Sequence, residues 1–582
     1  LEVLTQDLHL SLAQPSFVAS QIAYTSSIDD EAHMAAVKQV QDAIRDGQFY
    51  QLNFGRSWQG ELRESPWQLM QKLFKHNAAP YSGFLQLQVD GCRSALCSCS
   101  PELLLSFQNG YLSTCPIKGT CARSVDDAED QQLRKEMVVS QKEVAEHMML
   151  VDLERHDLGH ASIASTVAWD RWRVEAFPNI QHMVSKVTGR LGPSNDIWTA
   201  LEAVFPGGSI TGCPKTATIA AIDALEKEPR RSWTGSLGFA DLLSGEGQWN
   251  ILIRTLEAEV QDQVWHATVK AGGGLTIGSD PAAEVREAKL KAARILHVAF
   301  GKGSKAATAV AVSSASEGIP QDQGLRIEAG SSKAKQIAVE DVACESSSVR
   351  LEGLLKAFAA QRAEGAAAHG SWCLWSSKQL STASTQRVVF VDNLDSFSLN
   401  VANALAKLGA EVLVVPGRGP TSPDLDKVLR TAQPSHIVLG PGPGRPEMSP
   451  LTMAFARLAL RGRLPMPLLG LCLGHQSLGV AEGWKLSPSP LGPAHGVAEE
   501  IWHHQSGLFT HLESPARMMR YNSLVLEPPK AGSFSNLKVC AWDVTRRLPM
   551  ALESSHFQVY GVQFHPESAG SYQGNELLKA FL

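Results

Sequence analysis

A cysteine, a histidine and a glutamate near the C-terminus have the types and the order needed for acyl-transfer chemistry. Cys472 lies in the segment GLCLGHQSLG, whose glycines allow a sharp turn from a strand into a helix. The N-terminus of a helix favours the thiolate form of a cysteine. His565 and Glu567 lie in FHPES, so the imidazole can act as a base that the carboxylate orients. For Cys472 alone, a buried structural cysteine is an equal alternative, and FHPES argues against it.

A glycine-rich loop offers the other element that such chemistry needs. The segment GPGPG at 440–444 follows an apolar, strand-like run, and its backbone N–H groups are suited to binding an oxyanion. Leu473, directly after the cysteine, is the expected second N–H donor. The spacing therefore predicts a nucleophile, a base, an orienting carboxylate and an oxyanion site in one part of the chain.

Together with VDNLDSFSLN and MRYNSLVL, these motifs resemble the class I glutamine amidotransferases, of the type that serves chorismate enzymes, across residues 386–582. The resemblance implies that Cys472 forms a glutamyl thioester and releases ammonia. Asn522 stands where family members usually carry histidine. The residues that the resemblance implies for holding L-glutamine are Gly442, Pro443, Gly444, Gln476, Ser523 and Leu524.

Two pairs of carboxylates stand out in the first half of the chain. Glu143 and Glu146 are three residues apart in a helical pattern. Glu284 and Glu287 share one face of a second expected helix, with Lys291 a turn further on. Charged residues on a helix are usually a solvated face, but together these pairs offer the oxygen ligands that Mg²⁺ takes.

An ordered series of motifs in residues 24–298 resembles the chorismate-utilising enzymes, which include anthranilate, isochorismate, salicylate and aminodeoxychorismate synthases. The resemblance implies that Glu146 and Glu287 bind Mg²⁺, which clamps a substrate carboxylate, and that Arg254 pairs with a carboxylate. It also implies a chorismate site lined by Gly119, Thr120, Thr211, Trp233, Gly272, Gly274 and Lys291. The motifs are SPELLL, PIKGT, AEHMMLVDLERHDLG, QHMVS, FPGGSITGCPK, WTGSLGF, ILIRTLE, AGGG and SDPAAEVREAKLKA.

Lys118, within PIKGT, separates the branches of that family. In anthranilate synthases the corresponding stretch has alanine in place of the lysine. This chain is similar to the aminodeoxychorismate synthases, which carry the lysine. The resemblance implies that Lys118 is a nucleophile toward the chorismate ring, that Glu102 protonates the departing oxygen and that His182 assists near the ring. A lysine amine must then have a pKa below its usual value of about 10.4, through desolvation or a neighbouring cation such as the metal.

Length and composition fit a chain of two domains. The 582 residues are 44% hydrophobic and 19% charged, and the formal net charge is −6. Because no block of lysine or arginine and no long apolar run is present, we expect neither a nucleic-acid nor a membrane partner. Isolated cysteines favour a reducing compartment, so we expect the cytoplasm, with a plastid left open because the chain starts at Leu1.

The predicted architecture is an α+β chorismate-utilising fold with a β-sandwich-like core, followed by an α/β amidotransferase fold. We expect the first domain at 1–300, a low-complexity linker rich in Ala, Ser, Gly and Lys at 301–385, and the second domain at 386–582 in contact with the first. Family members usually carry a lobe before the first motif, so the start of the chain suggests a truncation.

The function that these resemblances imply is glutamine-dependent conversion of chorismate to 4-amino-4-deoxychorismate, for p-aminobenzoate and folate synthesis. Two alternatives stay open. One is anthranilate synthase, with amination at C2, and the other is a regulatory relic without catalysis. Departures from the family pattern, at Cys121, His156, His160 and Cys213, remove no proposed catalytic group.

Overall fold

A computed structural model describes residues 24–77, 79–89, 91–176, 180–241, 243–301, 306–308, 373–375, 386–419, 422–530 and 535–582. Most of the expected linker at 301–385 lies outside these residues, so the domain boundaries near 300 and 386 stay predictions. Within the described residues, no helix is long and apolar enough to cross a membrane.

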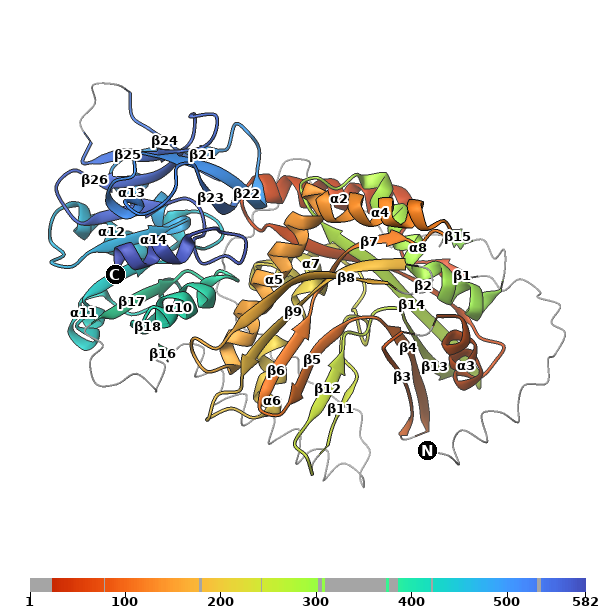
Figure 1. The fold of residues 1–582 in the computed structure, drawn as a ribbon. Helices are drawn as coiled ribbons and strands as arrows, with labels where there is room; N and C mark the ends of the chain where they lie inside the picture. The colour runs from red at the N-terminus through yellow and green to blue at the C-terminus, as the bar shows by residue number, and fades with distance from the viewer. Residues whose placement is uncertain are drawn as a thin grey trace, which may run out of the picture.

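The N-terminal part contains two large sheets, which Figure 1 shows fanning apart on the right of the molecule. The first sheet has the order β15(Ala306–Thr308), β1(Tyr24–Ser26), β2(Gln51–Glu61), β14(Val264–Leu275), β13(Thr255–Gln261), β4(Cys92–Ser100) and β3(Tyr81–Val89), and β10(Gly212–Cys213) pairs with β2. The second has the order β11(Gly238–Ala240), β12(Gly247–Asn250), β5(Leu103–Gln108), β6(Tyr111–Cys115), β9(Ile180–Arg190) and β7(Ile117–Ala122), and β8(Ala168–Ala176) pairs with β9.

Helices cover these sheets and connect their strands. They are α2(Asp30–Arg45), α3(Pro66–Asn77), α4(Asp127–Val139), α5(Gln141–Ala161), α6(Ile197–Val204), α7(Lys215–Leu225) and α8(Pro281–Phe300), with a 3₁₀ turn η1(Gly208–Ile210). The expected start of α8 is confirmed, because Asp280 caps it by accepting a hydrogen bond from Ala283 N–H. Helix α5 is buried over most of its length, which is unusual for a helix with this many charges.

The C-terminal part is built on one sheet with a parallel centre, as the alternation of apolar runs and helices predicts. Its strand order is β16(Cys373–Trp375), β18(Glu411–Pro416), β17(Arg387–Asp392), β19(His436–Leu439), β20(Leu468–Leu471), β27(Val559–Val562), β26(Pro549–Ser554), β25(Leu537–Trp542), β22(Ala494–His503) and β23(Ala516–Asn522). A separate pair is β21(Lys485–Pro488) and β24(Leu524–Glu527). The helices are α10(Ser398–Lys407), α11(Leu425–Ala432), α12(Pro450–Leu460), α13(Leu473–Ala481) and α14(Gly574–Phe581), with 3₁₀ turns η2(Pro446–Met448) and η3(Gly507–Phe509).

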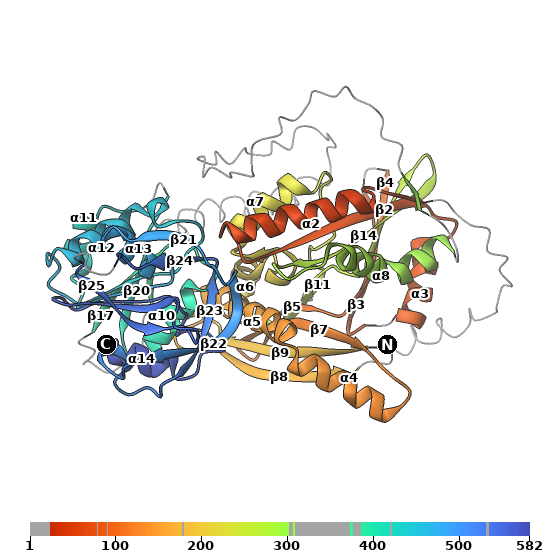
Figure 2. The same cartoon turned by 90° about the horizontal axis from the view of Figure 1, so that it is seen from above.

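The two parts are in direct contact. Helix α5 packs on the second sheet of the N-terminal part, against β9 and β7, and against α10 and β22 of the C-terminal part. Seen from above, one end of α2 also lies beside the C-terminal part (Figure 2), where Ser523 Oγ donates to Ile44 O at 2.7 Å. The expected contact between the domains is therefore present.

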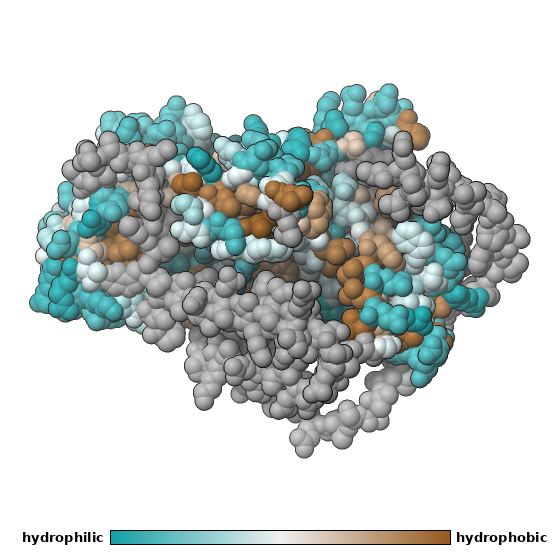
Figure 3. All heavy atoms as spheres, turned by 90° about the horizontal axis from the view of Figure 1, so that it is seen from below, coloured by the Kyte–Doolittle hydropathy of each residue, from teal (hydrophilic) through white to brown (hydrophobic). Residues whose placement is uncertain are grey.

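The face seen from below shows separate apolar areas among hydrophilic ones (Figure 3). Large apolar side chains with high exposure include Trp67, Phe74, Phe239 and Leu243. Scattered exposure of this kind is ordinary for a globular surface.

Candidate active sites

Cys472 occupies a strained turn between β20 and α13. Its φ of 48° and ψ of −98° lie in a region that side chains other than glycine rarely adopt. The turn is tight, because a Cβ at Gly470 would lie 2.5 Å from the backbone carbon of Gly474. The predicted elbow, with its cysteine at the start of a helix, is confirmed as a backbone feature.

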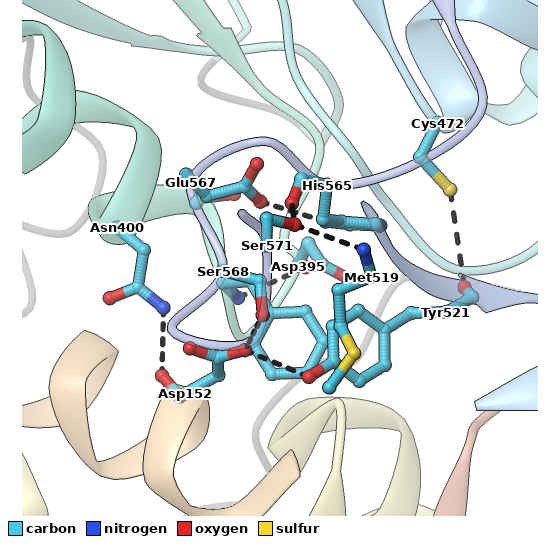
Figure 4. A network of polar contacts seen from close by, with 12 residues as sticks. Asp152, Asp395, Asn400, Cys472, Met519, Tyr521, His565, Glu567, Ser568 and Ser571 are labelled. Carbon is cyan, nitrogen blue, oxygen red and sulfur yellow. Dashed lines mark hydrogen bonds and ion pairs between the residues drawn. The ribbon is translucent and has the colours of Figure 1, made fainter. Parts of the chain in front are cut away.

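His565 and Glu567 form a buried pair next to this cysteine (Figure 4). His565 Nδ1 lies 2.7 Å from Glu567 Oε1. Burial lowers the pKa of His565, but the charge of Glu567 and the neighbouring Cys472 thiol outweigh it and hold the pKa well above its usual value. Among the described residues, no other group makes a close hydrogen bond to His565 Nε2, which leaves this nitrogen for proton exchange with the thiol.

Gln563 is a contact of the cysteine that the sequence analysis missed. Its Nε2 lies 3.5 Å from Cys472 Sγ, and its Oε1 accepts from Gln476 Nε2 at 3.1 Å. Gln563 is therefore positioned to donate a hydrogen bond to the sulfur of the proposed nucleophile. Its place two residues before the histidine, in VQFHPES, is the signal that could have identified it.

The residues expected to hold glutamine surround the elbow, and several contact the N-terminal part. Gln476 Nε2 donates to Leu524 O at 3.0 Å. Gly444 N–H donates to Gly47 O at 3.1 Å, so this amide is already paired. Arg418 holds the loop at 440–444 by donating to Pro443 O at 3.2 Å, close to Gly442. Leu473, the first residue of α13, stands at the N-terminal end of that helix.

Lys118 lies on β7 and faces the acidic side of α5. Its Nζ is 3.0 Å from Glu146 Oε2, and Lys142 approaches Glu146 Oε1 at 4.0 Å. A register shift between Lys118 and Thr120 accommodates Gly119, whose φ is +78°. The side chain of Thr120 lies outside the described residues.

The pKa of Lys118 runs against the expectation from sequence. Burial lowers it, but the charges of Glu146, Glu287 and Glu143 outweigh burial and raise the pKa above its usual value. In this arrangement the lysine is a charged partner of Glu146. A neutral amine therefore requires that the carboxylate be engaged by another cation.

The two acidic helices converge on Lys118. Like charges raise the pKa values of Glu143, beside Glu146, and of Glu284, beside Glu287, and in both cases burial contributes more. A Cβ at Gly273 would lie 3.2 Å from Glu284 Oε2 and 3.7 Å from Glu287 Oε1. This set of carboxylate oxygens suits Mg²⁺.

The described residues do not form a complete metal site by themselves. Within the described residues, no group of three or more His, Cys, Asp or Glu side chains is placed to hold a metal ion. Mg²⁺ commonly takes one or two carboxylates and fills its shell with water and substrate oxygens, so Glu146 and Glu287 fit the ion on these terms.

Glu102 and His182 lie in the same region, and burial shifts their pKa values in opposite directions. Burial raises the pKa of Glu102 to about 7, although Ser209 and the lysines at 118 and 291 oppose the shift. Burial also lowers the pKa of His182 to about 4, helped by Arg254. A carboxyl that keeps its proton near neutral pH can act as an acid, whereas His182 is neutral there.

The remaining predicted chorismate residues are held by backbone contacts. Lys291 Nζ lies 2.7 Å from Glu287 Oε1 and donates to Gly272 O at 2.9 Å. Arg254 Nη1 donates to the carbonyl of Lys291 at 3.0 Å. A Cβ at Gly274 would lie 3.3 Å from Lys118 Nζ, so the backbone of this glycine lies close to the lysine amine.

Thr211 and Trp233 lie around β2. The hydroxyl of Thr211 donates to Gly207 O at 2.8 Å. A Cβ at Gly55 would lie 2.1 Å from the Trp233 ring, and the guanidinium of Arg230 lies 4.8 Å from its centroid. These contacts fix the ring on the face of β2 that Gln51 also uses.

Gln51 is a second residue that the sequence analysis missed. It is buried, and neither its Oε1 nor its Nε2 has a hydrogen-bond partner among the described residues. A Cβ at Gly274 would lie 2.6 Å from Gln51 Nε2, which places the amide beside Lys118. A buried amide without a partner points to a ligand that completes its hydrogen bonds.

Comparisons with known proteins match the N-terminal and the C-terminal part of the chain to different families. The sequence model described as "chorismate binding enzyme" matches residues 4–297, and that of "Glutamine amidotransferase class-I" matches residues 389–582.

Several curated relatives match the N-terminal part. The chain is 39% identical over 261 residues to the aminodeoxychorismate synthase component 1 of Salmonella typhimurium, which covers 45% of this chain and 56% of the relative. It is 36% identical over 274 residues to the protein of that name from Escherichia coli K12, covering 47% and 58%. It is also 37% identical over 282 residues to an anthranilate synthase component 1 of Haloarcula marismortui, covering 48% and 54%. The chain thus spans little more than half the length of these relatives.

Solved structures of the same kind include anthranilate synthase component I from Streptococcus pneumoniae. It is 29% identical, with a TM-score of 0.44, over 50% of this chain and 64% of that one. Since the family model covers half of the chain, the chain belongs to the chorismate binding enzyme family, with a class-I glutamine amidotransferase match in the part that follows.

Proposed function

We propose that this protein is an aminodeoxychorismate synthase, which uses ammonia from glutamine to convert chorismate to 4-amino-4-deoxychorismate. The observation that carries the proposal is the pairing of Lys118 with Glu146 at the convergence of two acidic helices. Relatives named aminodeoxychorismate synthase component 1 support the same reading of the N-terminal part.

In the C-terminal part, the Cys472 thiolate attacks the side-chain amide carbon of glutamine. The amide nitrogen leaves as ammonia after taking a proton from His565, and water then hydrolyses the thioester to glutamate. Glu567 stabilises the imidazolium during the attack, and the N–H groups of Gly442 and Leu473 are the proposed donors to the oxyanion.

In the N-terminal part, Lys118 Nζ bonds to ring carbon C2 of chorismate, the two conjugated ring double bonds each shift by one position, and the C4–O bond breaks. Glu102 gives its proton to the departing oxygen, which leaves as water. Ammonia then bonds to C4, both double bonds shift back, and the bond from C2 to Lys118 breaks, so that the lysine leaves as a neutral amine. The ammonia-derived nitrogen passes a proton to Glu102, which restores the starting state.

Mg²⁺ would be held by Glu146 and Glu287 and would supply positive charge for the substrate carboxylate. We assign Arg254 to pairing with a carboxylate, because its fork is suited to that geometry. Gly119, Thr120, Thr211, Trp233, Gly272, Gly274 and Lys291 are the proposed lining of the chorismate site, with His182 as an uncharged neighbour. For glutamine the proposed lining is Gly442, Pro443, Gly444, Leu473, Gln476, Ser523 and Leu524.

The second candidate is anthranilate synthase. It is favoured by the anthranilate synthase component 1 from Haloarcula marismortui, whose sequence identity to this chain is about as high as that of the other relatives. Lys118 distinguishes the two, since a lysine used twice places nitrogen at C4 and direct addition of ammonia places it at C2.

Glutamine labelled with ¹⁵N in its side-chain amide tests the linkage of the two reactions. With chorismate and Mg²⁺ present, we expect the label to appear in an aminated chorismate product by mass spectrometry. Glutamine hydrolysis without any labelled product would refute the proposed synthase.

A further inference from the structure

Asp152 of helix α5 connects the N-terminal part to the catalytic loop of the C-terminal part. Its side chain is buried, with 1% exposure. Oδ2 accepts hydrogen bonds from Tyr521 Oη at 2.8 Å and from Ser568 Oγ, and Oδ1 accepts from Ala569 N–H at 2.9 Å. Figure 4 shows this carboxylate below the loop that carries His565 and Glu567.

Arg155, on the next turn of α5, makes further hydrogen bonds to this loop. Arg155 Nη1 donates to Asp152 Oδ1 at 2.6 Å, and both terminal nitrogens of Arg155 donate to Glu567 O, at 3.2 and 3.3 Å. From the C-terminal part, Asn400 Nδ2 donates to Asp152 O at 2.8 Å. The backbone at Glu567 and Ala569 is therefore held by one helix of the other part.

Tyr521 extends the contact to the cysteine side of the site. Its ring lies 5.1 Å from the His565 ring in an edge-on arrangement, and its carbonyl oxygen is 4.0 Å from Cys472 Sγ. The hydroxyl group that fixes this ring donates to Asp152. One carboxylate thus restrains elements that bear all three residues of the proposed triad or touch them.

We infer that Asp152 is a positioning residue for glutamine hydrolysis, supplied to the amidotransferase site by the chorismate-binding part of the chain. The inference rests on the proposed function of Cys472. A buried carboxylate with this many donors is stable only because each donor is directed at it. Its removal leaves the guanidinium of Arg155 without its charged partner and the loop without its anchor, and a displacement of about 1 Å at a catalytic group can cost about 10²-fold in rate.

A different contact between the two parts provides a matched control. Lys407 Nζ, on α10, donates to Val167 O at 2.7 Å and makes no contact with the loop at 565–569 that the structure records. Its loss removes an interface hydrogen bond and a like charge near Arg155, and it leaves every recorded hydrogen bond to the loop at 565–569 in place.

The experiment compares Asp152→Ala, Asp152→Asn and Lys407→Met in the full chain, by initial rates of glutamine hydrolysis. We expect Asp152→Ala to lower kcat by about 10²-fold while KM for glutamine stays within about threefold, because the carboxylate does not touch the proposed glutamine residues. Asp152→Asn should lose less, since its amide oxygen still accepts from Ala569 N–H while the two hydroxyl groups can turn to accept from its NH₂. Lys407→Met should match the wild type.

Equal losses in Asp152→Ala and Lys407→Met, or a rise in KM alone, would overturn the inference. If Asp152→Ala does not fold, Tyr521→Phe and Ser568→Ala carry the test, because each removes one donor without altering α5. Each should lower kcat relative to the wild type, because each removes one hydrogen bond to Asp152. Full kcat in both donor variants would contradict the inference.

A wild-type chain that hydrolyses no glutamine would refute the proposed function of Cys472 and the inference with it. A wild type that hydrolyses glutamine while all Asp152, Tyr521 and Ser568 variants keep its kcat would refute the inference alone.

Discussion

The two candidate sites differ in how complete they are without substrate. The amidotransferase site has its nucleophile on a strained elbow and its histidine already bonded to Glu567 at 2.7 Å. In the chorismate site the functional groups neutralise one another, since Lys118 pairs with Glu146 and Lys291 pairs with Glu287. On the proposed function, the first site would have its catalytic groups in place before glutamine binds, whereas the second would require a cation and substrate to separate its ion pairs.

The difference between the sites explains why Lys118 can be either a charged partner of Glu146 or a neutral nucleophile. Beside Glu146 the charged form of Lys118 is favoured, and its amine is then a poor nucleophile. If Mg²⁺ takes the carboxylate, the same burial that is now outweighed favours the neutral amine. On the proposed function, the chorismate site would need Mg²⁺ to release Lys118 from Glu146, whereas the amidotransferase site would need no such exchange.

Replacement of Cys472 by alanine should have the largest effect and should act on one site only. We expect glutamine-dependent amination to fall by about 10⁴-fold or more, because no other group forms the thioester. Amination with ammonium salts should persist, as the chorismate site is untouched. Cys540→Ala, which removes another buried thiol of the same part, is the control and should keep both activities. Loss of the ammonium reaction in folded Cys472→Ala would contradict the separation of the sites.

Lys118→Ala should have the converse effect. We expect amination from either nitrogen source to fall on the order of 10³-fold, while glutamine hydrolysis persists. With chorismate and no nitrogen source, the wild type should show an added mass on the peptide that contains PIKGT, and the variant should not. Lys142→Ala is the matched control, because this exposed lysine also approaches Glu146, at 4.0 Å, and should change activity little. An adduct that survives in Lys118→Ala would exclude the lysine as nucleophile.

Removal of one carboxylate from the acidic helices should shift the metal requirement. Glu146→Gln and Glu287→Gln should each raise the Mg²⁺ concentration for half-maximal amination by about tenfold or more, because each loses an anionic ligand. Glutamine hydrolysis in the absence of chorismate should not change with Mg²⁺. Glu136→Gln, at an exposed position on α4, serves as control. If all three variants need the same Mg²⁺ concentration for half-maximal amination, Glu146 and Glu287 are not the metal ligands.

The smallest effect concerns pH. Because burial raises the pKa of Glu102 to about 7, its carboxyl is protonated below that pH and loses its proton above it. Ammonia-dependent amination, corrected for the fraction of free ammonia, should decrease by about tenfold between pH 6 and pH 8 as the acid form is lost. Glu102→Gln should be slower and should lack this limb. If Glu102→Gln shows the same decrease in amination between pH 6 and pH 8, the decrease comes from another titrating group.

Local motifs predicted much of this arrangement. The elbow at Cys472, the capped start of α8 and the parallel centre of the C-terminal sheet follow from short-range spacing, which determines turns and helix ends directly. The convergence of Lys118 on Glu146 was expected only from family resemblance, because residues on different elements meet through the fold and not through spacing.

Two features of the sites could not be predicted from the sequence: the contacts of Asp152 and the direction of the pKa shift of Lys118. Asp152 lies 369 positions before Tyr521 and reads as an ordinary charged residue of a helix. The raised pKa of Lys118 also depends on which carboxylates the folded chain places around it. Long-range pairing of this kind is set by packing, which a single sequence does not specify.

The site of amination on the ring tests the central claim most directly. The wild-type chain, given chorismate, Mg²⁺ and glutamine, should release 4-amino-4-deoxychorismate, identified by its ultraviolet spectrum and by mass spectrometry, and Lys118→Ala should not produce it at a comparable rate. If the wild type releases fluorescent anthranilate and Lys118→Ala remains fully active, then Lys118 is not a nucleophile and the proposed function is wrong.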